Sequence, residues 1–215
     1  MTFTEKLRQA QKHLAANDPR LKAIIKTFGG CKLRPHRDFY AELISGIVGQ
    51  QLSVRAAATI WQRILVLNSG KLPTPLELRQ LKDEELRACG VSHPKIRYMK
   101  DLAQHIIDGR LDLDHISKLP NDELIEQLTA VKGIGEWSAH MFMIFSLGRL
   151  DILPTGDLGI RKAAMQVYSL RELPDVEKLR KLAKKNNWHP YESVASWYLW
   201  ESFDNKPAET RHPNT

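Results

Sequence analysis

Two features of the sequence could take part in chemistry: a short glycine turn and a carboxylate further along the chain. Gly133 and Gly135 flank Ile134 between two apolar helical segments, and Asp157 precedes a new helical pattern. Glycine permits positive φ and the close approach of a second backbone, and the first N–H groups of a helix have no partner within it. The pattern indicates a turn that can bind an anion and a carboxylate at the start of another helix.

Each feature also has a purely structural interpretation. Lys132 adds positive charge beside the turn, and the helix start near Glu136 could bind a phosphate. A helix–helix connection without any ligand would use the same glycines. Asp157 could only cap a helix. In an active site it could instead stabilise developing positive charge or activate water.

Helical signals recur along the chain and strand alternation is almost absent, so the sequence predicts an all-α fold of roughly ten helices. Asp18-Pro19 is typical of a helix start, and Gly29-Gly30 of its end. Thr74 to Glu77 has capping-box spacing with proline at the first helical position.

A second break in the helical pattern lies in "IVGQQLSVRAAATIW". Gly49 interrupts an apolar helix and Ser53 has the character of the next N-cap. We therefore expect Gln50, Gln51 and Leu52 to form a tight, exposed turn.

Composition narrows the class of protein without identifying it. The 215 residues are 42% hydrophobic and carry a net charge of +7, which suits a polyanionic partner but also an ordinary basic protein. Cys31 and Cys89 cannot build a disulfide framework or a four-cysteine metal site, and buried thiols are expected. No run of eighteen apolar residues occurs, so we expect a soluble, intracellular protein.

Several separated motifs together resemble a known family. "LTAVKGIGEWSA" followed by "LGRLDILPTGDLGIRKA" resembles the helix-hairpin-helix and Gly/Pro/Asp signature of the HhH-GPD DNA glycosylase superfamily. "GIVGQQLSVRAAATIW" and "WHPYESVASWYLWE" resemble its 3-methyladenine DNA glycosylase II (AlkA-like) branch. The resemblance runs from about Phe39 to Glu201.

This resemblance implies one bilobal all-α domain over residues 1–215 with the active-site cleft between its lobes. The middle six-helix lobe would cover about 39–150, and the second lobe 1–38 plus 151–215. The chain resembles the compact form of the family, without an N-terminal β domain.

The implied activity is that of a monofunctional DNA glycosylase of base excision repair. It would flip alkylated purines such as 3-methyladenine and 7-methylguanine out of the duplex and hydrolyse the N-glycosidic bond, leaving an abasic site. The "PTGD" match makes Asp157 the expected catalytic residue. The expected partner is double-stranded DNA with alkylated bases. The protein is expected to be a monomer that uses no cofactor and does not bind a membrane. The expected location is the bacterial cytoplasm and nucleoid or the eukaryotic nucleus.

Aromatic side chains are expected to bind the flipped base, because an indole face attracts a cationic purine. The resemblance points to Trp137 and Trp200, whereas Trp197 is expected in the core. For the side chain that fills the gap left in the duplex, the resemblance indicates Gln51 or Leu52, with Gln51 at the tip of the turn. A Leu52 packed into the core is the structural alternative.

The hairpin residues Lys132, Gly133, Ile134 and Gly135 are expected to contact DNA phosphates without reading sequence. The resemblance also suggests a monovalent cation at the carbonyls of Val131 and Ile134.

Two other functions remain open at this point. A non-catalytic DNA-binding or damage-sensing protein would keep the hairpin, but it has no need of Asp157 in a cleft. A bifunctional glycosylase/lyase would have a lysine two residues after the second hairpin glycine, where this chain has Trp137.

Overall fold

The structure, a computed structural model, describes residues 1–205. These residues form twelve α-helices, one short 3₁₀ helix and no strand, which confirms the all-α class. The expected count of about ten was low; α5 and α6, for example, are six residues each and are separated only by Leu81 and Lys82. The helices are α1 Phe3–Asn17, α2 Pro19–Phe28, α3 Phe39–Gly49, α4 Val54–Leu67, α5 Pro75–Gln80, α6 Asp83–Ala88, α7 His93–Ile107, η1 Ile116–Lys118, α8 Asn121–Thr129, α9 Glu136–Phe145, α10 Leu158–Val167, α11 Val176–Lys185 and α12 Glu192–Asp204.

The N-caps identified in the sequence are formed by side chains. Asp18 accepts the N–H groups of Arg20 and Leu21 at the start of α2. Ser53 caps α4, and Thr74 forms a capping box at the start of α5. Each cap satisfies backbone donors that a helix start leaves without a partner, and these three predictions are confirmed.

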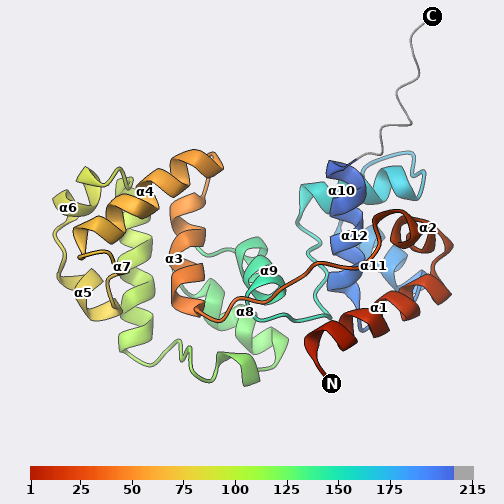
Figure 1. Cartoon of the computed structure of the whole chain (residues 1–215), viewed down its shortest axis with the longest axis horizontal. Coiled ribbons are helices and arrows are strands. Elements are labelled where there is room, and N and C mark those ends of the chain that lie inside the picture. The colour runs from red at the N-terminus through yellow and green to blue at the C-terminus, as the bar shows by residue number, and fades with distance from the viewer. Residues whose placement is uncertain (206–215) are drawn as a thin grey trace, which may run out of the picture. The chain divides into compact units, whose positions relative to one another are not determined.

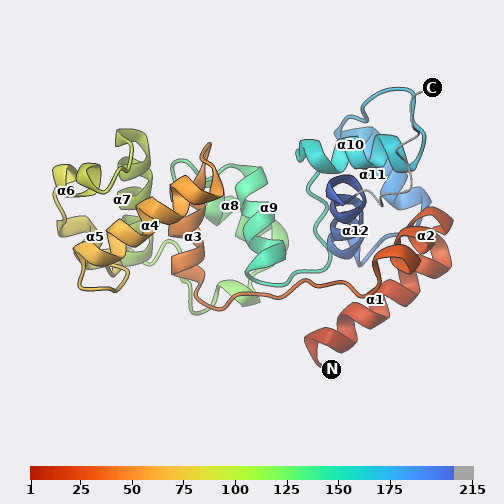
Figure 2. The same ribbon diagram turned by 45° about the horizontal axis from the view of Figure 1, so that its top comes forward.

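The chain divides into two units. The first comprises Met1–Pro35 and the chain from Met143 onward, and the second comprises His36–Phe142. In the first unit α12 contacts α1, α2 and α10; in the second, α7 contacts α3, α5 and α6 (Figures 1 and 2). The core of the first unit is built around α12, where Trp197 is only 8% exposed, as expected of a core residue.

A buried carboxylate joins distant parts of the first unit. Asp18 is fully buried and accepts hydrogen bonds from the hydroxyl of Tyr168 and the indole N–H of Trp188. Tyr168 is the C-cap of α10. Since a buried charge is stable only when its hydrogen bonds are satisfied, Asp18 fixes the end of α10 relative to α2.

The two cysteines differ in exposure. Cys89 is buried and Cys31 is only partly buried. Burial raises the pKa of the Cys31 thiol to about 12, so the thiol stays protonated at neutral pH. Within residues 1–205, none of the helices combines the length and the hydropathy that crossing a lipid bilayer would require.

Candidate active site

Asp157 lies at the N-terminus of α10, in the first unit. Its Oδ1 accepts the N–H of Ile160 at 2.8 Å, so it caps the helix. The same oxygen accepts the indole Nε1–H of Trp200, from α12, at 3.0 Å. The cap and the functional interpretation are therefore compatible, because one carboxylate caps the start of α10 and also accepts a hydrogen bond from a side chain expected in the base pocket.

The indole that donates to this carboxylate pairs with a second aromatic ring. Trp200 lies 5.7 Å from Phe145, between ring centroids, with the planes inclined by 31°. Phe145 is 37% exposed, so the pair reaches the surface. No local pattern selects Phe145, because an aromatic residue at the end of an apolar helix is more often part of a core.

A glycine allows Trp200 to approach Asp157. A Cβ at Gly159 would lie 3.0 Å from Asp157 Oδ1 and 3.5 Å from Trp200 Cδ1. The conformation of Gly159 is not left-handed, so the requirement is one of space. Gly159 is therefore, after Phe145, a second residue of the site whose role the sequence alone does not reveal.

The loop before Asp157 is held by the start of α12. Ile152 donates its N–H to Ser193 Oγ at 3.1 Å, and Ser193 Oγ donates to the carbonyl of Ile152 at 3.2 Å. The N–H of Ser193 also donates to the carbonyl of Leu150 at 2.9 Å. Ser193 is fully buried. These bonds fix the loop on the same helix that carries Trp200.

The glycine hairpin lies in the second unit, between α8 and α9. Gly133 has φ of +83°, and a Cβ there would lie 2.2 Å from Cδ2 of the Tyr98 ring. Ile134, which is 6% exposed, packs inward and donates its N–H to the carbonyl of Val131 at 3.1 Å. The first glycine is thus required both by backbone conformation and by contact with Tyr98.

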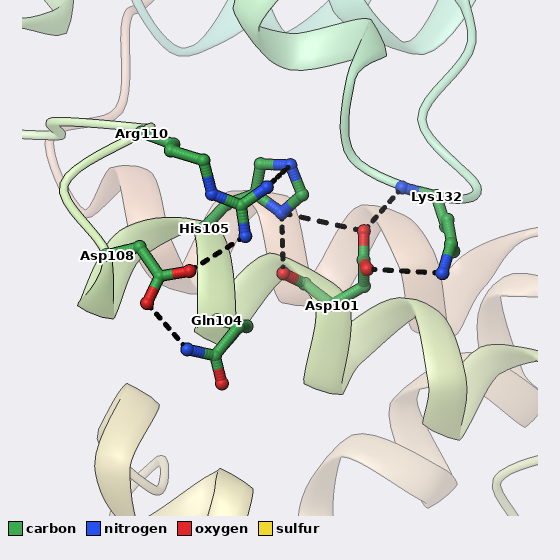
Figure 3. Close-up of polar contacts among 6 residues, drawn as sticks. All are labelled: Asp101, Gln104, His105, Asp108, Arg110 and Lys132. Atoms are coloured by element: carbon green, nitrogen blue, oxygen red, sulfur yellow. Dashed lines mark hydrogen bonds and ion pairs between the residues drawn. The ribbon is translucent and has the colours of Figure 1, made fainter.

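Figure 3 shows the polar network behind the hairpin. The carboxylate of Asp101, on α7, accepts the backbone N–H of Lys132 at 2.9 Å and lies 3.7 Å from the Lys132 ammonium. The carboxylate is 19% exposed, whereas the Lys132 side chain is 74% exposed. Asp101 therefore fixes the backbone of the turn while the lysine charge stays at the surface.

His105 extends this network on α7. Its Nε2 faces Arg110 Nη1 at 2.9 Å, and its Nδ1 lies 2.9 Å from the carbonyl of Asp101. A guanidinium can only donate, so Nε2 accepts and the proton of the neutral ring is on Nδ1. Arg110 also donates to Asp108 at 2.9 Å.

The expected turn between α3 and α4 is present and exposed. Gln51 has φ of +56°, and Leu52 is 40% exposed, which excludes the interpretation that Leu52 is packed into the core. Gln50 Nε2 donates to the carbonyl of Gly133 at 2.7 Å, so the turn and the hairpin are joined. Lys95 Nζ donates to the carbonyls of Val48 and Gln50, at 2.8 and 2.6 Å.

The expected site residues thus fall into two groups. Asp157 and Trp200 are in contact in the first unit. The hairpin and the Gln50–Leu52 turn are linked in the second unit, where Trp137 lies in the first turn of α9 and is 50% exposed. The place of Trp137 in a base pocket stays a prediction.

The hairpin carbonyls are compatible with the expected cation. The Val131 oxygen accepts one hydrogen bond, from Ile134, and a carbonyl oxygen has a second lone pair that can bind a metal. No group of three or more His, Cys, Asp or Glu side chains within residues 1–205 could hold a metal ion. A cation at this turn would therefore depend on backbone oxygen.

Comparison with known proteins identifies the family. Residues 44–188 match the HhH-GPD superfamily of base excision DNA repair proteins, and the chain belongs to that family. A DNA-3-methyladenine glycosidase structure from Bacillus halodurans is 40% identical, covers 91% of this chain and 89% of its own, and has a TM-score of 0.84. The Schizosaccharomyces pombe 3-methyladenine DNA glycosylase Mag1, solved with abasic DNA, is 36% identical with a TM-score of 0.77, covering 90% of this chain and 96% of its own.

A curated relative agrees with these structures. The DNA-3-methyladenine glycosylase 1 of Schizosaccharomyces pombe is 37% identical over 203 residues, which are 91% of this chain and 87% of the relative. The family and the class of enzyme expected from the sequence, a DNA glycosylase of base excision repair, are thereby confirmed.

Proposed function

We propose that this protein is a monofunctional DNA glycosylase that removes alkylated purines from duplex DNA, with Asp157 as its catalytic residue. The observation that carries the proposal is the double hydrogen bond at Asp157 Oδ1, from Ile160 N–H and Trp200 Nε1–H. A helix N-terminus stabilises negative charge. Two fixed donors also hold the carboxylate in one orientation, which is how a preorganised site stabilises charge that develops during reaction.

The chemistry follows from the charge of the substrate. A 3-methyladenine or 7-methylguanine base is cationic, so it leaves the sugar with little need of a general acid. As the N-glycosidic bond breaks, positive charge develops on the deoxyribose. The Asp157 carboxylate stabilises that charge and orients the water that attacks C1′, and the products are the free base and an abasic site.

Alkylated purines are proposed as substrates on two grounds. Trp200, which donates to Asp157 and pairs with Phe145, presents aromatic surface suited to a cationic ring. The relatives from Bacillus halodurans and Schizosaccharomyces pombe are named as a DNA-3-methyladenine glycosidase and a DNA-3-methyladenine glycosylase.

Binding to DNA is proposed to occur through the backbone of the hairpin. The N–H groups at the start of α9 would contact phosphates, with the exposed Lys132 charge beside them. A cation at the hairpin carbonyls would add further positive charge at this point. The resemblance places a lyase's lysine at the position of Trp137, so water is proposed as the nucleophile.

Asp157→Asn tests the assignment. Asparagine keeps the side-chain shape and an oxygen that can cap α10 but removes the charge, so single-turnover release of 3-methyladenine should fall by at least about 100-fold. Binding to a duplex with an abasic-site analogue should persist, because phosphate contacts are unchanged. A rate close to that of the wild type would exclude Asp157 as the catalytic residue. If the wild type itself binds damaged DNA without releasing any base, the non-catalytic alternative is correct.

A further inference from the structure

An open groove of about 430 Å³ runs along α4 in the second unit. Arg55, Thr59 and Arg63 line it and are spaced four residues apart, so they share one face of the helix. Gly90, in the turn after α6, also lines the groove.

A side chain at Gly90 would crowd residues that line the groove. The φ of Gly90 is +97°, a conformation that side chains with a Cβ rarely adopt, and a Cβ there would lie 3.3 Å from Ile60 Cγ1 and 3.7 Å from Arg63 Nη1. Ile60 and Ala56 supply the apolar part of the lining. The groove thus combines a small apolar surface with guanidinium groups, which suits the alternation of sugar and phosphate in a nucleic-acid backbone.

The two arginines are available to an anion. Both are exposed, and among the carboxylates whose side chains the structure describes, none lies within salt-bridge distance, 4.0 Å, of either one. Eight residues of α-helix separate them by about 12 Å along the axis, at 1.5 Å per residue. This spacing lets the two side chains meet different phosphates of one strand.

The groove is continuous with residues already expected to meet DNA. Ser53 is both the N-cap of α4 and part of the groove lining, and it directly follows Gln51 and Leu52. The neighbouring Gln50 is bonded to the carbonyl of Gly133 in the hairpin. The groove is thus linked to the turn through Ser53, and the turn is linked to the hairpin through Gln50.

We propose that this groove is a second phosphate-binding surface for the DNA duplex, which takes phosphates other than those at the hairpin through Arg55 and Arg63. The inference rests on the proposed function. If the turn enters the duplex at the lesion, the arginines meet the backbone of the same duplex and hold it while the base is extruded.

The test compares the double variant Arg55→Gln/Arg63→Gln with the wild type. The dissociation constant for a duplex with an abasic-site analogue is measured over a series of salt concentrations. Because each phosphate contact contributes about 0.9 to the salt slope, losing two should reduce its magnitude by about 1.8 and weaken binding by roughly tenfold per contact near 0.1 M salt. Undamaged duplex should show the same change in slope, because contacts to phosphates do not distinguish a damaged base from an undamaged one.

Two controls make the result specific. Arg79→Gln removes the same charge from an exposed arginine of the second unit, on α5, and should leave the slope unchanged. Arg55→Lys/Arg63→Lys keeps the charge and should retain most of the slope. Far-ultraviolet circular dichroism and melting temperature establish that each variant is folded.

The outcomes separate this proposal from the one on which it rests. Wild type that does not bind duplex DNA refutes the proposed function and the groove together. If the wild type binds and the double variant has the same slope and affinity, the proposal for the groove is refuted and the proposed function is not. An equal reduction by Arg79→Gln also refutes it, because the effect would then be one of overall charge.

Discussion

The hairpin and the loop that ends at Asp157 are both short breaks between helices, but they are held in different ways. The hairpin is fixed mainly through its backbone. Lys132 N–H bonds to Asp101, Ile134 N–H to Val131, and the carbonyl of Gly133 accepts Gln50. None of these bonds depends on the side chain of a hairpin residue.

The loop before Asp157 is fixed by side chains of α12. Ser193 holds Ile152 through two hydrogen bonds, and Trp200 donates to Asp157 itself. The Asp157 carboxylate and its donor Trp200 are 43 residues apart in the sequence.

This difference matches the roles proposed for the two regions, which are phosphate binding by the hairpin and catalysis by Asp157. A phosphate can be bound by any backbone N–H in the right place, so the hairpin depends on conformation and on small residues. A reaction needs one charged atom at a defined point, so Asp157 depends on long-range packing. Substitutions at the hairpin should therefore alter binding to all DNA, and substitutions around Asp157 should alter the rate.

The largest effect is expected at the first hairpin glycine. Gly133→Ala forces a Cβ to within 2.2 Å of the Tyr98 ring at a φ of +83°. Strain and overpacking together should lower the free energy of unfolding by about 2–5 kcal/mol. Affinity for damaged and undamaged duplex should fall alike. Thermal denaturation and fluorescence anisotropy measure the two quantities.

Gly135→Ala is the matched control. No atom lies within 4 Å of a Cβ at Gly135, and its φ is not in the left-handed region. Its stability should stay within about 1 kcal/mol of the wild type. The structure thus distinguishes two glycines that the sequence pattern treats alike. If both variants are destabilised equally, the contact with Tyr98 is not the reason for the first glycine.

The sequence predicts the local structure at helix starts and turns. The N-caps at Asp18, Ser53 and Thr74 and the helix start after Asp157 were all recognisable, because a cap bonds to residues two or three positions away. The same holds for the exposed turn at Gln51.

The sequence does not predict the partners that hold these regions. Asp101 meets Lys132 across 31 positions, and Ser193 meets Ile152 across 41. An aspartate on α7 or a serine on α12 has no local signature that separates it from other polar residues, because its role arises only when the helices pack. Gly159 shows the same limit, since its neighbour Trp200 comes from another helix.

A smaller effect is expected when one hydrogen bond to Asp157 is removed. Trp200→Phe keeps an aromatic ring beside Phe145 but loses the Nε1–H donor. A hydrogen bond to a charged group contributes about 1.5–3 kcal/mol, and partial exposure lowers this, so single-turnover base release should slow by roughly tenfold. Duplex affinity should stay the same. An unchanged rate would mean that Trp200 does not orient Asp157.

Trp200→Ala extends this comparison, because it removes the stacking surface as well. Excision of cationic bases should then suffer more than excision of neutral hypoxanthine, since the indole face attracts positive charge. A folded Trp200→Ala variant with an unchanged ratio between the two substrates would exclude Trp200 from the base pocket.

The smallest effect is expected at the turn between α3 and α4, where Gln51 and Leu52 are both exposed and both could fill the gap in the duplex. The residue that enters the duplex offsets part of the cost of unstacking, which is a few kcal/mol in total. If Gln51 has this role, Gln51→Ala should slow excision from a paired duplex by about fivefold, and less from a substrate whose lesion is already unpaired, where little unstacking cost remains. Leu52→Ala is the matched variant on the neighbouring residue. A loss confined to Leu52→Ala would assign the role to Leu52, whereas equal losses on paired and unpaired substrates would show that this turn contacts DNA without replacing the flipped base.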